Sequence, residues 1–599
     1  MHLPRLSPAL LLSLALPACA GLGGGASAPG PSAAPTSAPA GTPTAPVATT
    51  PAVAAPPPRA AHPNFLIILA DDIGVDKLGA YADDVPGART ADLPVTPQLD
   101  GLAQAGLRFT SAWAAPVCSP TRAMIQTGQY GFRTGVSTTV PPGPGLASDA
   151  ATFAQALVTS GYTTGLFGKW HLGTQGVRGS DDWRLADGQT MKDVADGPAP
   201  LRFGWQTYDG NLDGRIDDYH GWTRVQSQGN DRAVITQETR YATDVTTDVT
   251  LAWIQQQRGP WAAMVTYNAP HSDGEDRSYE ADDIDPSCPA RPRNDTPTAV
   301  YAALVQCLDD RVGKLINGIP AASLRDTVIL FIGDNGTEKL VIDGPFLPTT
   351  GREYGKATAY ETGVHVPYLV TSGQNWQERA ACLAAGATAP CSYSSGVVAQ
   401  PGRVVKAPVS VVDVAATLTS LAGTGLPSAT DSVSFAGCLS GSSPTCNTGG
   451  APRVLYTETY RSTAARGVST GAAALRSGDQ KLVIRYIPPG KCVRYEVYDL
   501  ASDPLETRDL AAQKDAGGLD LLTTALTTLH PPWLDGVPMC TGAMGTSGGG
   551  GRGEGGGQGG GQRGGGPRGG GGPKGGGVRG APGEGGEGGL RGGHHPKDQ

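Results

Sequence analysis

Residues 64–72 read NFLIILADD, a continuous apolar run that ends abruptly in two adjacent carboxylates. An apolar run without alternation is typical of a strand buried on both faces, as in a parallel sheet. Residues 328–336, VILFIGDNG, repeat this design. Parallel strands gather ligands at their carboxyl ends, so we expect the polar residues that follow both runs to converge there. An all-oxygen set of this kind favours calcium or magnesium over zinc. The converging residues would be Asp71, Asp72, Asp334 and Asn335.

Residues 116–122 read PVCSPTR and open a predicted helix that ends at Gly128. Ser119 suits the N-cap position, which would leave Cys118 just outside the helix N-terminus. Free backbone N–H groups and the helix dipole make that position attractive to an oxyanion. Arg122 adds a planar cation one turn further in. The same stretch would also suit a buried or disulfide-bonded Cys118 in an ordinary turn.

Two more segments place basic side chains directly after predicted strands. Residues 163–167 form a short strand that leads into GKWHLG, where Lys169 and His171 lie two residues apart in an extended segment and point the same way. Such a pair is a candidate anion site. A second strand, residues 261–267, ends at a proline, and the loop that follows presents His271.

Helices and strands alternate along the middle of the chain, which predicts an α/β fold. We expect a large mixed, mostly parallel sheet flanked by helices. Beyond residue 452, shorter alternating runs predict a smaller C-terminal α+β subdomain with a terminal helix. The predicted helices cover residues 97–105, 152–160, 244–257, 298–318 and 409–421.

Both ends of the chain differ from the middle in composition. Residues 1–19 carry an apolar run too short to span a bilayer and predict a signal peptide. Their last four residues, LPAC, resemble a bacterial lipobox, which would lipidate Cys19 and anchor the protein to a membrane; cleavage nearby would instead give a soluble exported protein. Residues 20–62 predict a disordered Ala/Pro-rich tether, and residues 546–599 a disordered Gly-rich tail. Arg-Gly tracts can bind RNA, but in an exported chain we expect no nucleic-acid partner.

The cysteine count agrees with export. Apart from Cys19 and Cys118, eight cysteines remain at mostly short spacings, which suits disulfides in an oxidising compartment. Sequential pairing is the simplest scheme, although eight cysteines permit many others. We therefore expect a periplasmic, outer-membrane or cell-surface lipoprotein, or otherwise a secreted protein. The eight are Cys288, Cys307, Cys382, Cys391, Cys438, Cys446, Cys492 and Cys540.

The segment around Cys118 resembles the activating Cys-x-Pro-x-Arg motif of the sulfatases, and further motifs resembling that family follow in its order from residue 64 to about residue 510. The resemblance implies an alkaline-phosphatase-like fold, with a catalytic domain at residues 63–450 and a C-terminal subdomain at residues 451–545. It also implies an arylsulfatase-like enzyme that hydrolyses sulfate esters. A formylglycine-generating enzyme would oxidise Cys118 to formylglycine during export, and the aldehyde hydrate would be the nucleophile.

The same resemblance implies a role for each candidate site residue. Asp334 would accept the proton of the nucleophile, and His171 would deprotonate the remaining hydroxyl so that sulfate leaves. The implied ligands of a divalent cation, usually calcium, are Asp71, Asp72, Cys118, Asp334 and Asn335. The implied sulfate-binding and proton-transfer residues are Arg122, Lys169, His171, His271 and Lys356.

Some positions depart from the family's pattern. Gln126 lies where an apolar residue is common, and Thr362 and His365 replace the customary Gly and Arg. The last two lie near Lys356 and bear on the geometry of its loop. Residues 209–216, DGNLDGRI, look like half of a calcium loop, but they lack the glutamate and flanking helices of an EF-hand.

Two other functions remain open. A phosphonate monoester or phosphodiester hydrolase of the same superfamily could use an analogous nucleophile and cation. An inactive, surface-tethered binding protein would keep Cys118 as a thiol, although binding sulfate alone needs neither this cysteine nor adjacent metal carboxylates. The predicted specificity loops, residues 174–231 and 274–294, carry aromatics but no marked basic cluster, which favours a small or singly sulfated ester.

Overall fold

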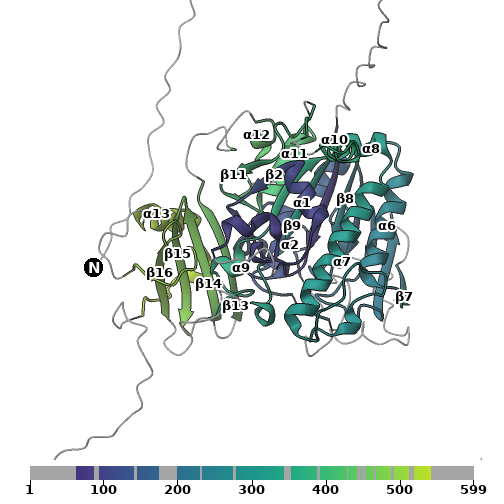
Figure 1. The fold of residues 1–599 in the computed structure, drawn as a ribbon. Helices are drawn as coiled ribbons and strands as arrows, with labels where there is room; N and C mark the ends of the chain where they lie inside the picture. The colour runs from purple at the N-terminus through teal and green to yellow at the C-terminus, as the bar shows by residue number, and fades with distance from the viewer. Residues whose placement is uncertain are drawn as a thin grey trace, which may run out of the picture. The chain divides into compact units, whose positions relative to one another are not determined.

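A computed structural model gives the fold of the chain (Figure 1). The predicted signal peptide, the tether up to residue 61 and the Gly-rich tail lie outside the described residues, as do parts of both predicted specificity loops. Within the described part, no helix is both long and apolar enough to cross a bilayer. The structure describes residues 62–540 without 87–92, 141–144, 174–198, 230–232, 274–277, 343–352, 388–390, 395, 428–429, 442–445, 447–452, 464–466, 488–491 and 512–518.

A ten-stranded mixed sheet forms the centre of the fold. The five strands β9, β1, β8, β4 and β5 run parallel, and antiparallel pairs occur only towards the two sides. The predicted mostly parallel sheet is therefore confirmed. In spatial order the strands are β11 (Arg403–Val405), β2 (Gly106–Phe109), β10 (Tyr368–Ser372), β9 (Thr327–Gly333), β1 (Asn64–Ala70), β8 (Trp261–Thr266), β4 (Thr163–Gly168), β5 (Thr207–Gly210), β6 (Trp222–Gln228) and β7 (Val234–Glu238).

Helices cover both faces of this sheet, which explains the continuous apolar run of β1. Phe65, Ile67 and Leu69 belong to one core with side chains from α2, α4 and α11. Leu66 and Ile68 belong to a second core with α1, α6 and α7, and α6 and α7 lie side by side (Figure 1). The helices are α1 (Pro97–Gln104), α2 (Cys118–Thr127), α4 (Phe153–Thr159), α6 (Ala242–Gln256), α7 (Pro297–Gly318) and α11 (Asp413–Leu421).

Shorter elements complete the main body. They are β3 (Ala112–Trp113), β12 (Val409–Ser410), α3 (Gly131–Thr134), α5 (Ala199–Arg202), α8 (Ala321–Arg325), α9 (Glu361–Val364), α10 (Gly373–Ala384), α12 (Ala436–Leu439), and the 3-10 turns η1 (Val75–Lys77), η2 (Gly79–Asp84), η6 (Ala281–Asp283) and η7 (Lys339–Val341).

The start of α2 differs from the prediction. Val117, not Ser119, is the N-cap residue, so Cys118 is the first residue of the helix. The Ser119 hydroxyl instead accepts a hydrogen bond from the Val140 N–H at 3.0 Å. The end of the helix is as predicted, because Gly128 adopts the left-handed conformation with φ of 69°.

The helix predicted at residues 409–421 also begins later than expected. Residues 409–410 form β12, in which Val409 pairs with Ala112 of β3. The helix starts only at Asp413, whose carboxylate accepts the Ser410 N–H at 2.9 Å. Val409 and Ser410 thus form a separate two-stranded sheet with β3 rather than the first turn of the helix.

A four-stranded antiparallel sheet and a terminal helix follow, as predicted. The sheet packs directly on the main body, since Tyr456 and Leu475 join the core of α2, and Leu455 packs with Trp113. The elements are β13 (Leu455–Thr463), β14 (Gly467–Ser477), β15 (Gln480–Ile487), β16 (Cys492–Asp499), α13 (Leu519–Leu529) and the turn η9 (Pro532–Leu534).

A buried charge cluster joins this C-terminal sheet to the loop before α9. The fully buried Lys481 ammonium lies 2.9 Å from Glu361 and 2.8 Å from Glu506, and Arg476 lies 3.4 Å from Glu361. Burial opposes ionisation of Glu361, but Lys481 and Arg476 nevertheless hold its pKa at about 2. Glu361 begins α9 and therefore fixes the end of the loop that carries Lys356.

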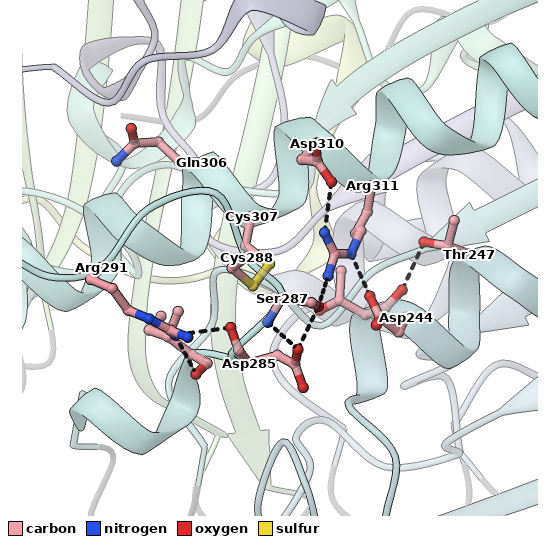
Figure 2. The surroundings of a disulfide bond; sticks show 12 residues. Asp244, Thr247, Asp285, Ser287, Cys288, Arg291, Gln306, Cys307, Asp310 and Arg311 are labelled. Carbon is pink, nitrogen blue, oxygen red and sulfur yellow. Dashed lines mark hydrogen bonds and ion pairs between the residues drawn. A yellow bond between two sulfur atoms is a disulfide. The ribbon is translucent and has the colours of Figure 1, made fainter.

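Four disulfides join the eight remaining cysteines in sequential pairs, as predicted: Cys288–Cys307, Cys382–Cys391, Cys438–Cys446 and Cys492–Cys540. Figure 2 shows the first, which ties the chain after the His271 loop to α7. Beside it, Arg311 of α7 donates to Asp244 of α6 and, at 2.5 Å, to Ser287 (Figure 2). The segment is thus anchored to α7, which Arg311 in turn ties to α6.

We expect Lys481→Met to destabilise the protein by about 3–5 kcal/mol, because it removes the buried cation that Glu361 and Glu506 share. Denaturant and thermal unfolding measure this change. Arg494→Met is the matched control, since the Arg494 side chain is 44% exposed and its ion pair with Asp509, at 3.5 Å, is exposed to solvent; we expect it to stay within about 0.5 kcal/mol of the wild type. Equal stability of the two variants would contradict the structural role of Lys481.

Candidate active site

The polar residues that follow β1 and β9 meet at the carboxyl edge of the sheet. The Asp72 N–H donates to Asp334 Oδ1 at 3.1 Å, and Asn335 Nδ2 donates to Asp72 Oδ1 at 2.7 Å. Asp71, Asp72, Asp334 and Asn335 are all fully buried. The parallel pairing of β1 with β9 brings them together, because Ala70 lies beside Gly333 at the ends of the two strands.

Cys118 reaches the same point from the first turn of α2. Its thiol donates to Asp71 Oδ1 at 3.3 Å, and the residue is 1% exposed. Every other cysteine in the described part of the chain is disulfide-bonded. Donor atoms of Asp71, Asp72, Cys118 and His271 all lie within 4.8 Å of one another. His271, which the sequence assigned to anion binding, therefore also faces the predicted metal ligands.

Arg122, one turn after Cys118, ties three strand ends together. Its Nε and Nη2 donate to Asp334 Oδ2 at 3.2 and 2.8 Å, and its Nη1 donates to the Lys169 carbonyl at 2.8 Å. Nη2 also lies 3.6 Å from Asp71. One guanidinium thus bridges the ends of β1, β9 and β4.

Two lysines and a histidine meet the remaining carboxylate oxygens. Lys169 is ion-paired with Asp71, and the Lys356 ammonium lies 2.7 Å from Asp72. His271 Nε2 lies 3.6 Å from the same Asp72 carboxylate. Each carboxylate of the site therefore faces a basic group that comes from a different segment of the chain.

The segment that carries Lys169 and His171 is not extended, contrary to the prediction. His171 has a φ of 55°, in the left-handed region. The Lys169 side chain turns inward to Asp71, while the His171 ring lies against Gly214 and lines a cleft above Cys118. Both side chains still reach the site, but along separate directions.

The charges of the site shift several pKa values. Burial alone would raise the pKa of Asp71, but Lys169 and other cations hold it well below its usual value. Burial raises the pKa of the Cys118 thiol, and lowers the pKa of His271 to about 4. Burial, together with the charge of Asp71, raises the pKa of Asp334 to about 7. An unmodified Cys118 is therefore a protonated thiol and a poor nucleophile at neutral pH.

The oxygen atoms of the site fit a divalent cation. Asn335 Oδ1 is buried and accepts no hydrogen bond within the part of the chain that the structure describes. Asp71 and Asp72 add carboxylate oxygens, which are the donors that calcium and magnesium prefer. The soft Cys118 sulfur is the exception, because thiolate ligands select zinc or copper(I) instead.

A cavity of 610 Å³ opens above these residues. Its floor includes Cys118, His171, His271 and Lys356. Of the predicted specificity loops, the first contributes Asp213, Gly214 and Arg215, and the described part of the second contributes no lining residue. The other wall comes from the C-terminal sheet through Thr459, Tyr460, Arg461, Thr470, Gly471, Ala472 and Tyr486. No sequence signal identifies this wall, because it depends on how the two sheets pack.

The departures from the family's pattern have structural partners. Gln126 Oε1 accepts the Trp205 indole N–H at 3.1 Å, so its buried amide is satisfied. Thr362 Oγ1 accepts the Gly355 N–H at 2.8 Å, next to Lys356. These contacts hold α2 and the Lys356 loop in place.

The segment 209–216 is not arranged as a calcium site. The two oxygens of Asp209 are held by Arg224 at 2.6 and 2.7 Å. Asn211 donates to the carbonyls of Asp213 and Arg215. The polar side chains of Asp209 and Asn211 are therefore held by protein contacts, which agrees with the missing EF-hand features noted in the sequence.

The comparisons with known proteins agree on one family. The family model described as Sulfatase matches residues 63–424. Steryl-sulfatase from Mus musculus is 28% identical over 451 residues, which cover 64% of this chain and 65% of that protein. Arylsulfatase G from Homo sapiens is 45% identical over 121 residues, covering 20% and 22%. The matched part of the chain thus spans between about a fifth and 65% of the length of these curated relatives.

Solved structures share the fold. A putative sulfatase from Bacteroides fragilis superimposes with a TM-score of 0.57 at 19% identity, covering 80% of this chain and 98% of that one. At this identity the likeness concerns the fold alone.

Proposed function

The chain belongs to the sulfatase family, and on that premise we propose that it hydrolyses sulfate monoesters. The observation that carries the proposal is the position of Cys118: a lone thiol, 3.3 Å from Asp71, within a buried set of carboxylates and cations. A binding site for sulfate would need the cations alone. The added carboxylates and the cysteine support chemistry at this point.

Residue 118 is proposed to be matured by a formylglycine-generating enzyme, and its hydrated aldehyde would then supply the nucleophile that a protonated thiol does not. Arg122 would orient the site, because it fixes both Asp334 and the Lys169 carbonyl. Asp334 is the proposed proton acceptor beside residue 118, and His171, at the cleft wall, would take the proton whose loss releases sulfate.

Lys169, Lys356 and His271 are proposed to face the sulfate group. The contacts of the two lysines with Asp71 and Asp72 support this, since cations already gathered there need little rearrangement to meet an incoming anion. The His271 imidazole, whose pKa burial lowers to about 4, lies beside them, 3.6 Å from Asp72. Charge that grows on the sulfuryl oxygens and the departing alkoxide would be stabilised by these residues more strongly than the ground state is.

Asp71, Asp72, Asp334 and Asn335 are the residues that would hold a calcium ion, with magnesium as an alternative. The buried Asn335 Oδ1 without a hydrogen bond supports this assignment. When bound, such an ion supplies positive charge that polarises a sulfuryl oxygen.

The substrate is proposed to be a small, singly sulfated ester. A cavity of 610 Å³ suits a ligand of that size. Its lining mixes the acidic Asp213 and Glu338 with the basic Arg215, Lys339 and Arg461, rather than the dense positive charge expected for a highly sulfated polymer. Two of the curated relatives are a steryl-sulfatase and an arylsulfatase, which agrees with this class.

Export and membrane anchoring are also proposals. Four disulfides in the described part support an oxidising compartment such as the periplasm or the exterior. Lipidation of Cys19 stays a prediction from the sequence.

We expect the purified protein to hydrolyse 4-nitrophenyl sulfate faster than an aryl phosphonate monoester or an aryl phosphate diester. Steady-state kcat/KM values for these substrates measure the preference. A clear preference for a phosphorus substrate would replace the sulfatase assignment by the related hydrolase.

Mass spectrometry of the peptide that spans Cys118 gives a second test. We expect formylglycine at this position. An unmodified thiol in protein from the native host, together with no turnover, would indicate a binding protein.

Metal removal should destabilise the protein in a way that calcium reverses. Binding to the folded state alone adds about 2.7 kcal/mol of stability at a ligand concentration 100 times the Kd. We expect calcium to raise the melting temperature of the chelator-treated wild type and of Asp209→Asn, a variant changed in strand β5 outside the site. Asp72→Asn should lose most of this response. An equal response in Asp72→Asn would show that calcium binds elsewhere.

Lys356→Ala should lower kcat by roughly 10²–10³, the effect of losing one contact that strengthens in the transition state. The loss should be smaller for phenols that leave easily, because they need less stabilisation as the bond breaks. Lys339→Ala is the matched control, since Lys339 lines the same cavity but is 41% exposed; its kcat should stay within about twofold of the wild type. A normal kcat in Lys356→Ala would remove Lys356 from the site, while calcium content and Cys118 conversion are expected to stay unchanged.

A further inference from the structure

The segment after β5, residues 211–219, runs beside the segment that carries His171. The Trp170 N–H donates to the Asn211 carbonyl at 3.0 Å, and the His171 N–H donates to the Leu212 carbonyl at 3.2 Å. These bonds lie just beyond the ends of β4 and β5, whose parallel pairing stops at Phe167 and Asp209. The backbone of His171 is therefore fixed by this neighbouring segment.

Gly214 leaves room for the His171 ring. A Cβ atom at Gly214 would lie 2.3 Å from His171 Nε2 and 2.5 Å from Cε1, well inside contact distance. Any side chain at this position would displace the ring. Gly214 and His171 both line the cavity above Cys118, so a displaced ring would move within the site itself.

The Asn211 side chain keeps Gly214 at that place. Its Nδ2 donates to the carbonyls on either side of Gly214, those of Asp213 at 3.1 Å and Arg215 at 3.4 Å. Its Oδ1 accepts Asn268 Nδ2 at 2.9 Å. Asn211 is 4% exposed, and its side chain thus holds the turn closed from inside the protein.

The same segment holds the loop that presents His271. The Asn268 carbonyl accepts the His271 N–H at 2.9 Å, and the Tyr219 hydroxyl donates to the His271 carbonyl at 2.9 Å. The Tyr219 N–H also donates to Asp273 Oδ2 at 3.2 Å. Residues 211–219 therefore lie between the two histidine-bearing loops and contact both.

We infer that Gly214 and Asn211 are positioning residues that set the His171 imidazole in the site, and that residues 211–219 couple its position to that of His271. The inference rests on the proposed function in giving His171 a part in turnover. The placement of the ring against Gly214 is independent of that function.

Gly214→Ala tests the inference directly. We expect its kcat for 4-nitrophenyl sulfate to fall about 10²-fold with KM changed less than about twofold, because misplacing a reacting group by about 1 Å has an effect of that size. Gly221→Ala is the matched control two residues beyond this segment, since the nearest atom to a Cβ at Gly221 would lie 3.7 Å away. Asn211→Ala should lower kcat in the same direction without adding atoms, which keeps the test intact if Gly214→Ala does not fold.

A double-mutant cycle with His171→Ala separates positioning from general damage. In the His171→Ala background, adding Gly214→Ala should change kcat less than about twofold, since the two variants remove the same contribution. The inference would be overturned if Gly214→Ala lowered kcat by the full factor of about 10² in the His171→Ala background as well, or if Gly214→Ala were as active as Gly221→Ala.

Crystal structures of the wild type and of Gly214→Ala give a readout that does not depend on turnover. A His171 ring displaced from its wild-type position supports the inference even if the proposed substrate class is wrong. A ring in the wild-type position would overturn it. Normal turnover by His171→Ala would instead contradict the proposed role of His171 in turnover. In that case the position of the His171 ring in the two crystal structures would still decide whether Gly214 positions it.

Discussion

Compensation of buried negative charge at the carboxyl edge of the sheet is the constraint on which the rest of the structure depends. Three carboxylates lie there with no exposure to water, an arrangement that is very costly unless cations and hydrogen bonds meet them. No single segment could provide that compensation. The first turns of α2, the end of β4, the end of β8 and the loop before α9 each deliver one basic residue, and the helices that cover the sheet hold those four segments in register. The compensating cations are Arg122, Lys169 and Lys356, and the fourth basic residue is His271, whose pKa burial lowers to about 4.

The C-terminal sheet contributes to this site in two ways. Through Lys481 it holds the Glu361 end of the Lys356 loop, and through residues of β13–β15 it forms one wall of the cleft. The part of the chain that holds the Lys356 loop therefore also lines the cleft. For the proposed esterase, replacing residues on this wall would change which ester fits, while Lys481 and its partners would keep the Lys356 ammonium in place.

The sequence predicted the sheet well because buried parallel strands have a strong signature, the unbroken apolar runs of β1 and β9. It also placed the four oxygen-bearing residues together, since strands that run parallel end at the same edge. The start of α2 was missed because the Ser119 hydroxyl meets the N–H of Val140, 21 residues away, rather than capping its own helix. The close approach of Gly214 to His171 and the wall from β13–β15 arise only from packing between distant segments, for which local propensity carries no information.

The disulfides join each cysteine to its next neighbour in the chain, with separations of 19, 9, 8 and 48 residues. Loops of this kind close at low entropic cost, so each pair can form within its own stretch of chain, without exchange with a more distant partner. Cys118 precedes all eight in the sequence and belongs to none of these neighbouring pairs. If residue 118 is matured during export as proposed, this order would keep its thiol out of oxidative cross-linking while a modifying enzyme could still reach it, before the sheet closes around it.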